Sequence, residues 1–367
     1  MKKWRLLTGI VLASMLALPS FNAYAEQVYK FGLVAAFTGG PAAAYGVAVR
    51  RGAELALNEI NAKGGIKGHR LEAIMVDDQA NPTLTVSTVH RFISVDKVPI
   101  IFGSFTSVSL AAIPVVSKAK VVWITPLVTH PGVIHKSRWA FSVSINLAQT
   151  SAYVAEFAYR RGARRPGLVV FNNESTRRMG EAVKKKFKSL GGKVVAEEIM
   201  PRGADFRSTL LKLKAARPDA LIIASFVGPE ALLIKQMAEL GWKVPTYSAN
   251  PVEEEVFFKT VGDAAEGLLY GSLLSNPKKY ENFRQRFKQR YKEEPGTFGA
   301  QGYETAYVIA EAIKRGGYTS QGIRNALAGL KNFNGVLGTW SFDDGGFSDL
   351  PITMKVIKGK RFEFYKR

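Results

Sequence analysis

Hydroxyl-bearing side chains follow two of the apolar runs that we expect to form buried strands. Residues 103–107 read Gly-Ser-Phe-Thr-Ser and residues 125–129 read Thr-Pro-Leu-Val-Thr, each directly after such a run. Ser107 is placed to open a helix, whose free N–H groups and positive dipole end suit a carboxylate. The two segments therefore predict a site for a small carboxylate. Helix N-capping by Thr106 and Ser107 is the simpler alternative, and it is compatible with ligand binding.

Residues for catalytic chemistry are scarce. The sequence has no cysteine and four histidines, and the spacing of His130 and His135 does not place them on one helical face. Asp77 and Asp78 follow an expected strand, but neighbours on a strand point to opposite faces, so we expect a structural loop role. No phosphate-loop, nucleophile-elbow or zinc-protease motif is present. We therefore expect a binding protein rather than an enzyme, with no metal and no cofactor.

The elements that must position these segments alternate between short strands and amphipathic helices. This order predicts an α/β fold with parallel sheets covered by helices on both faces, and such sheets bind ligands at the carboxyl ends of their strands. The pattern starts again near residues 138–151, so we expect two α/β units. The expected strands are 29–35, 70–76, 98–102, 121–124, 167–171, 194–199 and 220–225, and the expected helices are 46–61, 83–95, 180–190, 206–216 and 230–240.

The chain after Leu269 is predominantly helical and too short for a third domain. We expect it to return and complete the two earlier sheets with its last strand-like runs. The expected helices are 281–291, 303–315 and 320–328, followed by strand-like runs at 338–342 and 352–357.

The first residues are typical of a secretory signal peptide. Three basic residues precede an apolar run, residues 6–18, which is too short to span a bilayer, and residues 23–25 (Ala-Tyr-Ala) fit a cleavage site. We expect cleavage after Ala25 and a mature chain in the periplasm. A retained N-terminal membrane anchor is the alternative.

The chain is strongly basic, with 51 Lys and Arg against 30 Asp and Glu and a formal net charge of +21. Basic and aromatic residues (Arg284, Phe287, Lys288 and Tyr291) are interleaved over 284–291, as they are in proteins that bind nucleic acid. However, Phe283, Phe287 and Tyr291 recur at the spacing of a core-facing helical stripe. We therefore expect no nucleic-acid partner, and we interpret the charge as steering anionic ligands or meeting an acidic envelope surface.

Several sequence blocks resemble a known family. The most specific is residues 59–68 (Glu-Ile-Asn-Ala-Lys-Gly-Gly-Ile-Lys-Gly), followed by a strand and two aspartates. Supporting blocks are residues 124–126, 204–206, 218–220, 262–267, 302–306 and 338–343. Together they resemble the periplasmic leucine/isoleucine/valine-binding proteins of branched-chain amino acid ABC importers, over essentially the whole mature chain.

This resemblance implies a type I periplasmic-binding-protein fold: two doubly wound, Rossmann-like lobes joined by three hinge crossovers, with the ligand in the cleft between them. Residues 1–25 would be the signal peptide. The N-terminal lobe would comprise residues 26–146 plus 274–341, and the C-terminal lobe residues 147–273 plus 342–367.

The resemblance also implies roles for individual residues. Tyr45 matches an aromatic wall of the cleft, and Ser107 and Thr129 match hydroxyls that hold the ligand's α-carboxylate together with backbone N–H groups. Leu127 matches a backbone carbonyl that accepts from the α-ammonium, and Phe226 lies near an aromatic residue of the second lobe. The complete candidate set is Tyr45, Phe105, Thr106, Ser107, Leu127, Val128, Thr129, Thr176, Phe226 and Asn250.

Two positions depart from the family pattern. Thr176 stands where the second lobe has a tyrosine, and Asn250 stands where an acidic residue pairs with the ligand ammonium. An asparagine accepts a hydrogen bond but carries no charge, so a desolvated ammonium would be poorly compensated. Glu253, Glu254 or Glu255 could substitute after a loop shift, and Arg177 or Arg178 could instead add a second anion contact.

The resemblance therefore implies a periplasmic substrate-binding protein that closes on a hydrophobic amino acid or a related carboxylate by hinge rotation. Its partners would be the permease and ATPase of an ABC importer, and we expect a monomer. One alternative is a binding protein for an aromatic or branched organic acid that lacks the amino group. Another is a ligand-sensing module that acts on a signalling partner.

Overall fold

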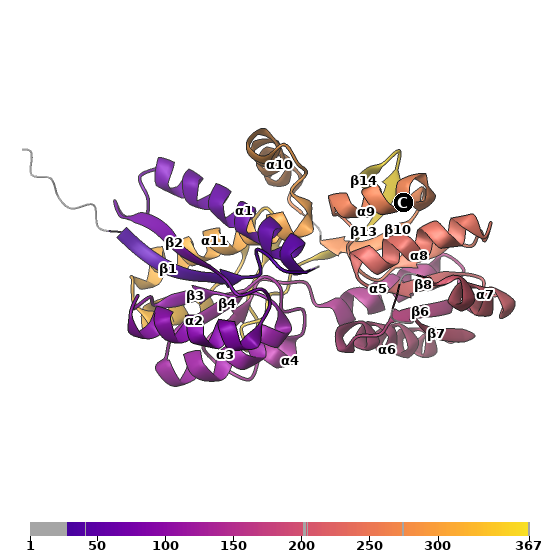
Figure 1. Cartoon of the computed structure of the whole chain (residues 1–367), viewed down its shortest axis with the longest axis horizontal. Coiled ribbons are helices and arrows are strands. Elements are labelled where there is room, and N and C mark those ends of the chain that lie inside the picture. Colours follow the sequence, from indigo (N-terminus) through magenta and orange to yellow (C-terminus); the bar gives the residue numbers. More distant parts are fainter. Residues whose placement is uncertain (1–27, 41, 201–202, 204, 274, 366–367) are drawn as a thin grey trace, which may run out of the picture.

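The computed structural model describes residues 28–40, 42–200, 203, 205–273 and 275–365. The expected signal peptide, residues 1–25, lies outside the described residues. The chain forms two lobes that lie side by side, each built around its own sheet (Figure 1).

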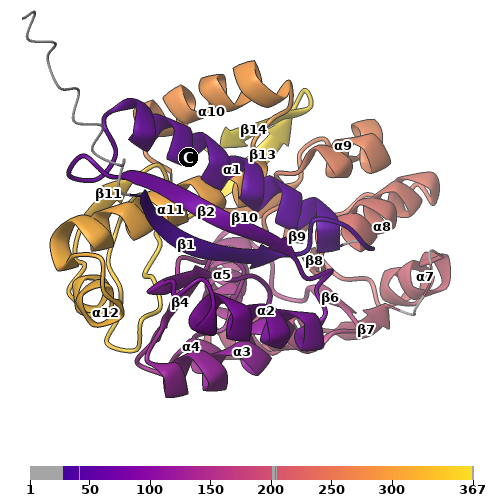
Figure 2. The same ribbon diagram turned by 60° about the vertical axis from the view of Figure 1, so that its left-hand side comes forward.

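The first lobe has a five-stranded sheet in the order β2-β1-β3-β4-β5, in which all the pairings are parallel. Alternate residues of β1 face opposite sides: Leu33 packs in one core cluster and Val34 in another. Helix α1 covers one face, and α2 and α3 cover the other (Figure 2). The elements are β1 Val28–Ala35, α1 Ala42–Ala62, β2 Arg70–Asp77, α2 Pro82–Ser94, β3 Ile100–Phe102, α3 Thr106–Ala119, β4 Val122–Thr125, α4 Pro131–Ile134 and β5 Ala140–Ser142.

Later segments complete the first lobe. Helix α11 packs so closely along α1 that a Cβ on Gly52 would lie 2.0 Å from the carbonyl oxygen of Gly299. Glycine at position 52 is what lets the two helices approach. The segments are α10 Pro277–Tyr291, α11 Gly296–Gly316, α12 Ser320–Ala328 and a hairpin of β11 Phe333–Gly335 with β12 Gly338–Trp340.

The second lobe has a seven-stranded sheet in the order β14-β13-β10-β9-β8-β6-β7. Strands β13 and β14 join it antiparallel, and the other pairings are parallel. The elements are α5 Leu147–Arg160, β6 Gly167–Phe171, α6 Glu174–Ser189, β7 Ala196–Met200, α7 Arg207–Ala215, β8 Leu221–Ala224, α8 Val227–Glu239, β9 Thr246–Ser248, α9 Glu255–Val261, the 3-10 turn η1 Gly262–Ala265, β10 Leu269–Leu273, β13 Ile352–Lys358 and β14 Arg361–Phe364.

The predicted fold class, two α/β lobes with parallel sheets, is confirmed. The last strand-like run joins the second sheet as β13, as expected. The expectation that residues 338–342 complete a main sheet is wrong, because β12 pairs only with β11 in a separate hairpin. Helix α5 was not expected, because its buried face includes Thr150 and Ser151, which interrupt the apolar pattern.

The chain passes between the lobes after β5, after β10 and before β13. Two of these connections lie against each other: the Ser144 amide donates to Ser348 Oγ at 3.0 Å, and Ser348 Oγ donates to the Ser144 carbonyl at 2.9 Å. The lobe boundaries given above stay a prediction.

Candidate functional site

The two hydroxyl-rich segments lie at the carboxyl ends of neighbouring strands, β3 and β4. The Gly103 amide donates to the Ile124 carbonyl at 2.8 Å, and Thr125 Oγ1 donates to the Ser104 carbonyl at 2.7 Å. A Cβ on Gly103 would lie 1.8 Å from the Trp123 ring, so only glycine fits there. The sheet therefore brings together the two segments that the sequence analysis singled out.

Helix α3 begins at Thr106 beside these segments. Its N-cap is Phe105, and no side chain caps it, so the expectation that Thr106 or Ser107 serves as an N-cap is wrong. The first-turn N–H groups thus have no side-chain acceptor, and Ser107 is exposed beside them. Ser104 Oγ is buried and has no hydrogen-bond partner among the described residues. This arrangement suits a carboxylate.

Residues 127–129 form the adjoining wall. Leu127 is buried, and its amide donates to Thr125 Oγ1 at 3.1 Å. The Val128 side chain is fully buried and its carbonyl accepts from Ser142 Oγ at 2.8 Å, so Val128 can shape the wall. Thr129 is partly exposed.

Tyr45, on α1, is the centre of an aromatic cluster. Its ring centroid lies 6.3 Å from that of Phe105 and 4.7 Å from that of Phe298, both in edge-to-face contacts. Burial, and secondly the charge of Glu254, raise the pKa of Tyr45 to about 12. Phe298, on α11, is a candidate that the sequence analysis missed, because it lies far along the chain from the other residues.

Glu254 belongs to the loop after β9 of the second lobe, yet it reaches the start of α11 in the first lobe. A Cβ on Gly296 would lie 2.6 Å from Glu254 Oε2. Burial raises the pKa of Glu254 to about 8; the N–H groups of Phe298 and Thr297 oppose this shift, and the charge of Glu253 adds to it. Oε1 is buried without a hydrogen-bond partner among the described residues. Helix α11 has no side-chain cap of its own, so a carboxylate is well placed there.

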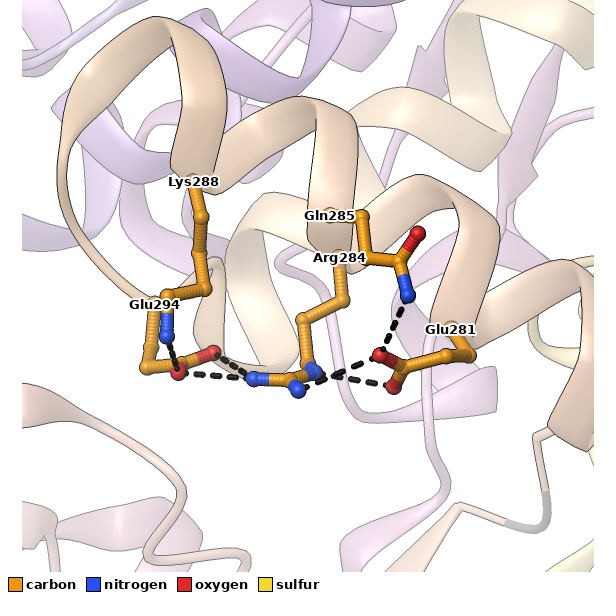
Figure 3. A network of polar contacts seen from close by, with 5 residues as sticks. All are labelled: Glu281, Arg284, Gln285, Lys288 and Glu294. Carbon is orange, nitrogen blue, oxygen red and sulfur yellow. Dashed lines mark hydrogen bonds and ion pairs between the residues drawn. The ribbon is translucent and has the colours of Figure 1, made fainter.

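The start of α11 is held by a network of ion pairs (Figure 3). Arg284 on α10 contacts Glu281 at 2.9 Å and Glu294 at 2.8 Å, and Lys288 contacts Glu294 at 2.7 Å. Because Glu294 lies in the turn between α10 and α11, the network fixes that turn in front of Gly296. Much of the basic charge on α10 is thus neutralised locally.

Two further candidates come from the second lobe. Asn250 is buried, and its Nδ2 donates to the Pro251 carbonyl at 3.1 Å, which leaves Oδ1 as an acceptor without a described partner. Phe226 is the N-cap residue of α8 and is half-buried, and its ring centroid lies 5.8 Å from that of Phe171. Phe171, at the end of β6, was not expected.

Thr176 must be removed from the candidate set. Its side chain is fully buried, and its hydroxyl donates to the Phe171 carbonyl at 2.5 Å and to the Asn173 carbonyl at 2.9 Å. It therefore tightens the first turn of α6, and its hydroxyl hydrogen is not available to a ligand. Arg177 donates to Asn172 at 2.9 Å and Arg178 pairs with Glu174 at 2.8 Å, so both guanidinium groups have local partners.

Several other residues that the sequence analysis discussed have local contacts. Asp77 accepts from the Phe37 amide and Asp78 from the Thr85 hydroxyl, as expected for loop residues. Phe283 and Phe287 are buried in the core, as their spacing predicts. Within the described ranges, no group of His, Asp and Glu could hold a metal ion. No described helix is long and apolar enough to cross a membrane.

The chain matches the family model described as "Periplasmic binding protein" over residues 28–354, and it therefore belongs to that family. A related protein is the Leu/Ile/Val-binding protein homolog 1 of Brucella abortus, 27% identical over 94% of this chain and 94% of that protein. The leucine-, isoleucine-, valine-, threonine- and alanine-binding protein of Pseudomonas aeruginosa is 26% identical over 91% of each chain.

A similar solved structure is the branched-chain amino acid transporter substrate-binding protein LivJ of Streptococcus pneumoniae, in complex with isoleucine. Its TM-score is 0.83 at 25% identity, covering 93% of this chain and 100% of that chain. The expected type I periplasmic-binding-protein fold is thereby confirmed, and family membership confirms a binding protein rather than an enzyme.

Proposed function

We propose that this chain is the periplasmic substrate-binding component of an ABC importer and that its ligand is a branched-chain or other hydrophobic amino acid. The observation that carries the choice of ligand is the Glu254 carboxyl group, whose Oε1 is buried without a partner while its charge acts on Tyr45. A carboxylate here replaces the acidic residue that is missing at Asn250.

The first lobe would hold the ligand's α-carboxylate, and both lobes would contact its α-ammonium. The α-carboxylate would lie at the start of α3, where Ser104, Ser107 and Thr129 offer hydroxyl groups. The α-ammonium would pair with Glu254 and donate to Asn250 Oδ1 and to the Leu127 carbonyl. Contacts to both lobes made by one ligand favour the closed state, which is how a binding protein of this kind closes.

The apolar side chain of the ligand would contact the aromatic cluster. Tyr45, Phe105 and Phe298 provide one wall, and Phe226 with Phe171 provides the opposite one. These apolar ring surfaces would favour contact with a branched aliphatic group over a second charged group. The closed form would deliver the ligand to the importer's permease and ATPase, and the mature chain would begin at Glu26 in the periplasm.

A second ligand class is favoured by one observation, the neutral Asn250. A branched or aromatic acid without an amino group would use the same carboxylate site and would leave Glu254 protonated.

A thermal-shift screen of ligand-stripped mature protein separates the two classes, because a ligand that binds the native state raises the melting temperature. We expect shifts with leucine, isoleucine or valine and none with their deaminated analogues; the reverse result would overturn the choice of ligand.

A further inference from the structure

Two neighbouring acids, Glu253 and Glu254, have different surroundings. Glu254 is in extended backbone, with φ −122° and ψ 143°. Side chains of successive extended residues point in opposite directions. Glu253 therefore turns into the second lobe, while Glu254 turns toward Gly296 of the first.

The Glu253 carboxylate is held by a buried ion pair. Its Oε1 lies 2.8 Å from Lys355 Nζ, and the two side chains are only 6% and 8% exposed. The same oxygen accepts from Ser272 Oγ at 2.5 Å. The pair thus ties the loop after β9 to two strands, β10 through Ser272 and β13 through Lys355.

Two aromatic rings lie beside the Lys355 ammonium group. Its Nζ lies 5.0 Å from the ring centroid of Phe364 on β14 and 5.9 Å from that of Tyr280 on α10. The aromatic faces attract the ammonium group and exclude water from it. A buried cation enclosed in this way stays beside its single carboxylate partner.

We infer that the Glu253–Lys355 ion pair positions the loop from Asn250 to Glu254 and holds Glu254 across the lobe boundary against the start of α11. The ion pair thereby sets how strongly the site distinguishes an ammonium-bearing ligand from its deaminated analogue. Only the effect on ligand discrimination rests on the proposed function. Lys355 touches no ligand; it acts through the loop that carries both of the second lobe's proposed ammonium contacts.

The charges of Glu253, Glu254 and Lys355 also affect ligand discrimination electrostatically. An unpaired Glu253 carboxylate next to Glu254 would disfavour a negative charge on Glu254. The ligand ammonium, however, would bind the ionised form of Glu254. Lys355 offsets part of the Glu253 charge, so that the ligand's positive charge is left for Glu254. The carboxylate end of the ligand would lie on the other lobe, so its binding would not depend on the Glu253–Lys355 pair.

The test compares Lys355→Met with Lys358→Met in the mature full chain. Lys358 is on the same strand, is exposed and has no ion pair among the described residues, so it is a matched control. In the ligand-free protein we expect Lys355→Met to speed amide hydrogen exchange about tenfold or more in residues 249–257 and 296–300, with β6 and β8 unchanged. Unchanged exchange in both segments, or a uniform increase over the whole second lobe, would overturn the inference.

The second readout is the ratio of the dissociation constants for leucine and 4-methylpentanoate. We expect Lys355→Met to reduce this discrimination about tenfold through weaker leucine binding, and Lys358→Met to change it less than about twofold. Equal weakening of both ligands would show a merely structural role. The double variant Glu253→Gln with Lys355→Met removes both buried charges and with them the electrostatic part of the effect. A ratio that stays below the wild-type value although the melting temperature recovers supports the positioning role, and full recovery of both contradicts it. A wild-type protein that binds no leucine would refute the proposed function, while the exchange experiment would still decide the positioning role.

Discussion

The Thr125 hydroxyl donates a hydrogen bond of 2.7 Å to the backbone carbonyl of Ser104. This bond joins the two loops that follow β3 and β4, and the Thr125 hydroxyl also accepts from the Leu127 amide at 3.1 Å. One buried side chain therefore sets the spacing between the start of α3 and the 127–129 wall. The carboxylate site depends on that spacing.

Thr125→Val keeps the shape of the side chain and removes both bonds. We expect the free energy of unfolding to fall by about 1–3 kcal/mol, because a buried amide loses its acceptor. Affinity for leucine and for 4-methylpentanoate should fall by the same factor, because the two ligands share the carboxylate. Urea unfolding and calorimetric titration measure the two effects, and Thr339→Val, at an exposed position, is the control. A larger loss for leucine alone would contradict this assignment.

Ser104 and Ser109 are both buried serines, but of their two hydroxyl groups only that of Ser109 has hydrogen-bond partners among the described residues. Ser109 Oγ donates to the Ser104 carbonyl and accepts from Trp123 Nε1, each at 3.1 Å, whereas Ser104 Oγ has no described partner. We expect Ser104→Ala to weaken ligand binding and leave stability within about 0.5 kcal/mol. Ser109→Ala should instead lower stability by about 1–3 kcal/mol. Thermal melts with and without ligand distinguish the two variants; normal affinity in Ser104→Ala would remove that hydroxyl from the site.

Glu254 should make ligand binding depend on pH. Burial raises its pKa from 4.5 to about 8, so the folded, ligand-free chain keeps a proton that the unfolded chain has lost between these values. The free energy of unfolding should therefore decrease as pH rises through this window. An ammonium ligand needs the ionised carboxylate, so leucine affinity should increase from about pH 6 to about pH 8.

The same argument predicts that leucine binding near neutral pH releases a proton. Calorimetric titrations in buffers with different ionisation enthalpies measure that release, and Glu254→Gln should abolish it. Leucine affinity that is flat with pH, or equal proton release in the variant, would show that Glu254 is not the ammonium partner.

Gly296 has a φ of +58°, and a Cβ there would lie 2.7 Å from the Glu253 carbonyl as well as close to the Glu254 carboxylate. Gly241 has nearly the same φ, +60°, with nothing within 4 Å of the corresponding Cβ. Gly241→Ala should cost about 1–2 kcal/mol from backbone strain alone. Gly296→Ala should cost more and should weaken leucine binding, because it also pushes Glu254 away from α11. Equal costs in urea unfolding would mean that the lobes do not approach here.

The sequence predicted the parts of the site that local pattern determines. The segments 103–107 and 125–129 follow buried strands, and the ends of parallel strands meet at one edge, so their meeting could be expected. Glu254 could be named only as one of three neighbouring acids, and Phe298 could not be named at all, since both depend on how the loop after β9 meets the start of α11. No spacing along the chain encodes that contact.

Thr176 shows a different limit. Its position matched a family tyrosine, but a short hydroxyl side chain at the start of α6 bonds to nearby carbonyls instead of reaching outward. Likewise, the run at 338–342 has the composition of a sheet strand, yet β12 pairs with β11, and Trp340 Nε1 donates to the buried Glu304 at 2.9 Å. In both cases the structure has a polar contact that the hydrophobic pattern does not predict.

The most direct test of the account is a set of four calorimetric titrations: leucine and 4-methylpentanoate, each with the wild-type protein and with Glu254→Gln. We predict that the variant binds leucine about 10–100-fold more weakly and 4-methylpentanoate with an affinity changed by less than about twofold. A wild-type protein that prefers 4-methylpentanoate, or a variant that loses both ligands equally, would contradict the claim that Glu254 binds the ammonium group of an amino acid.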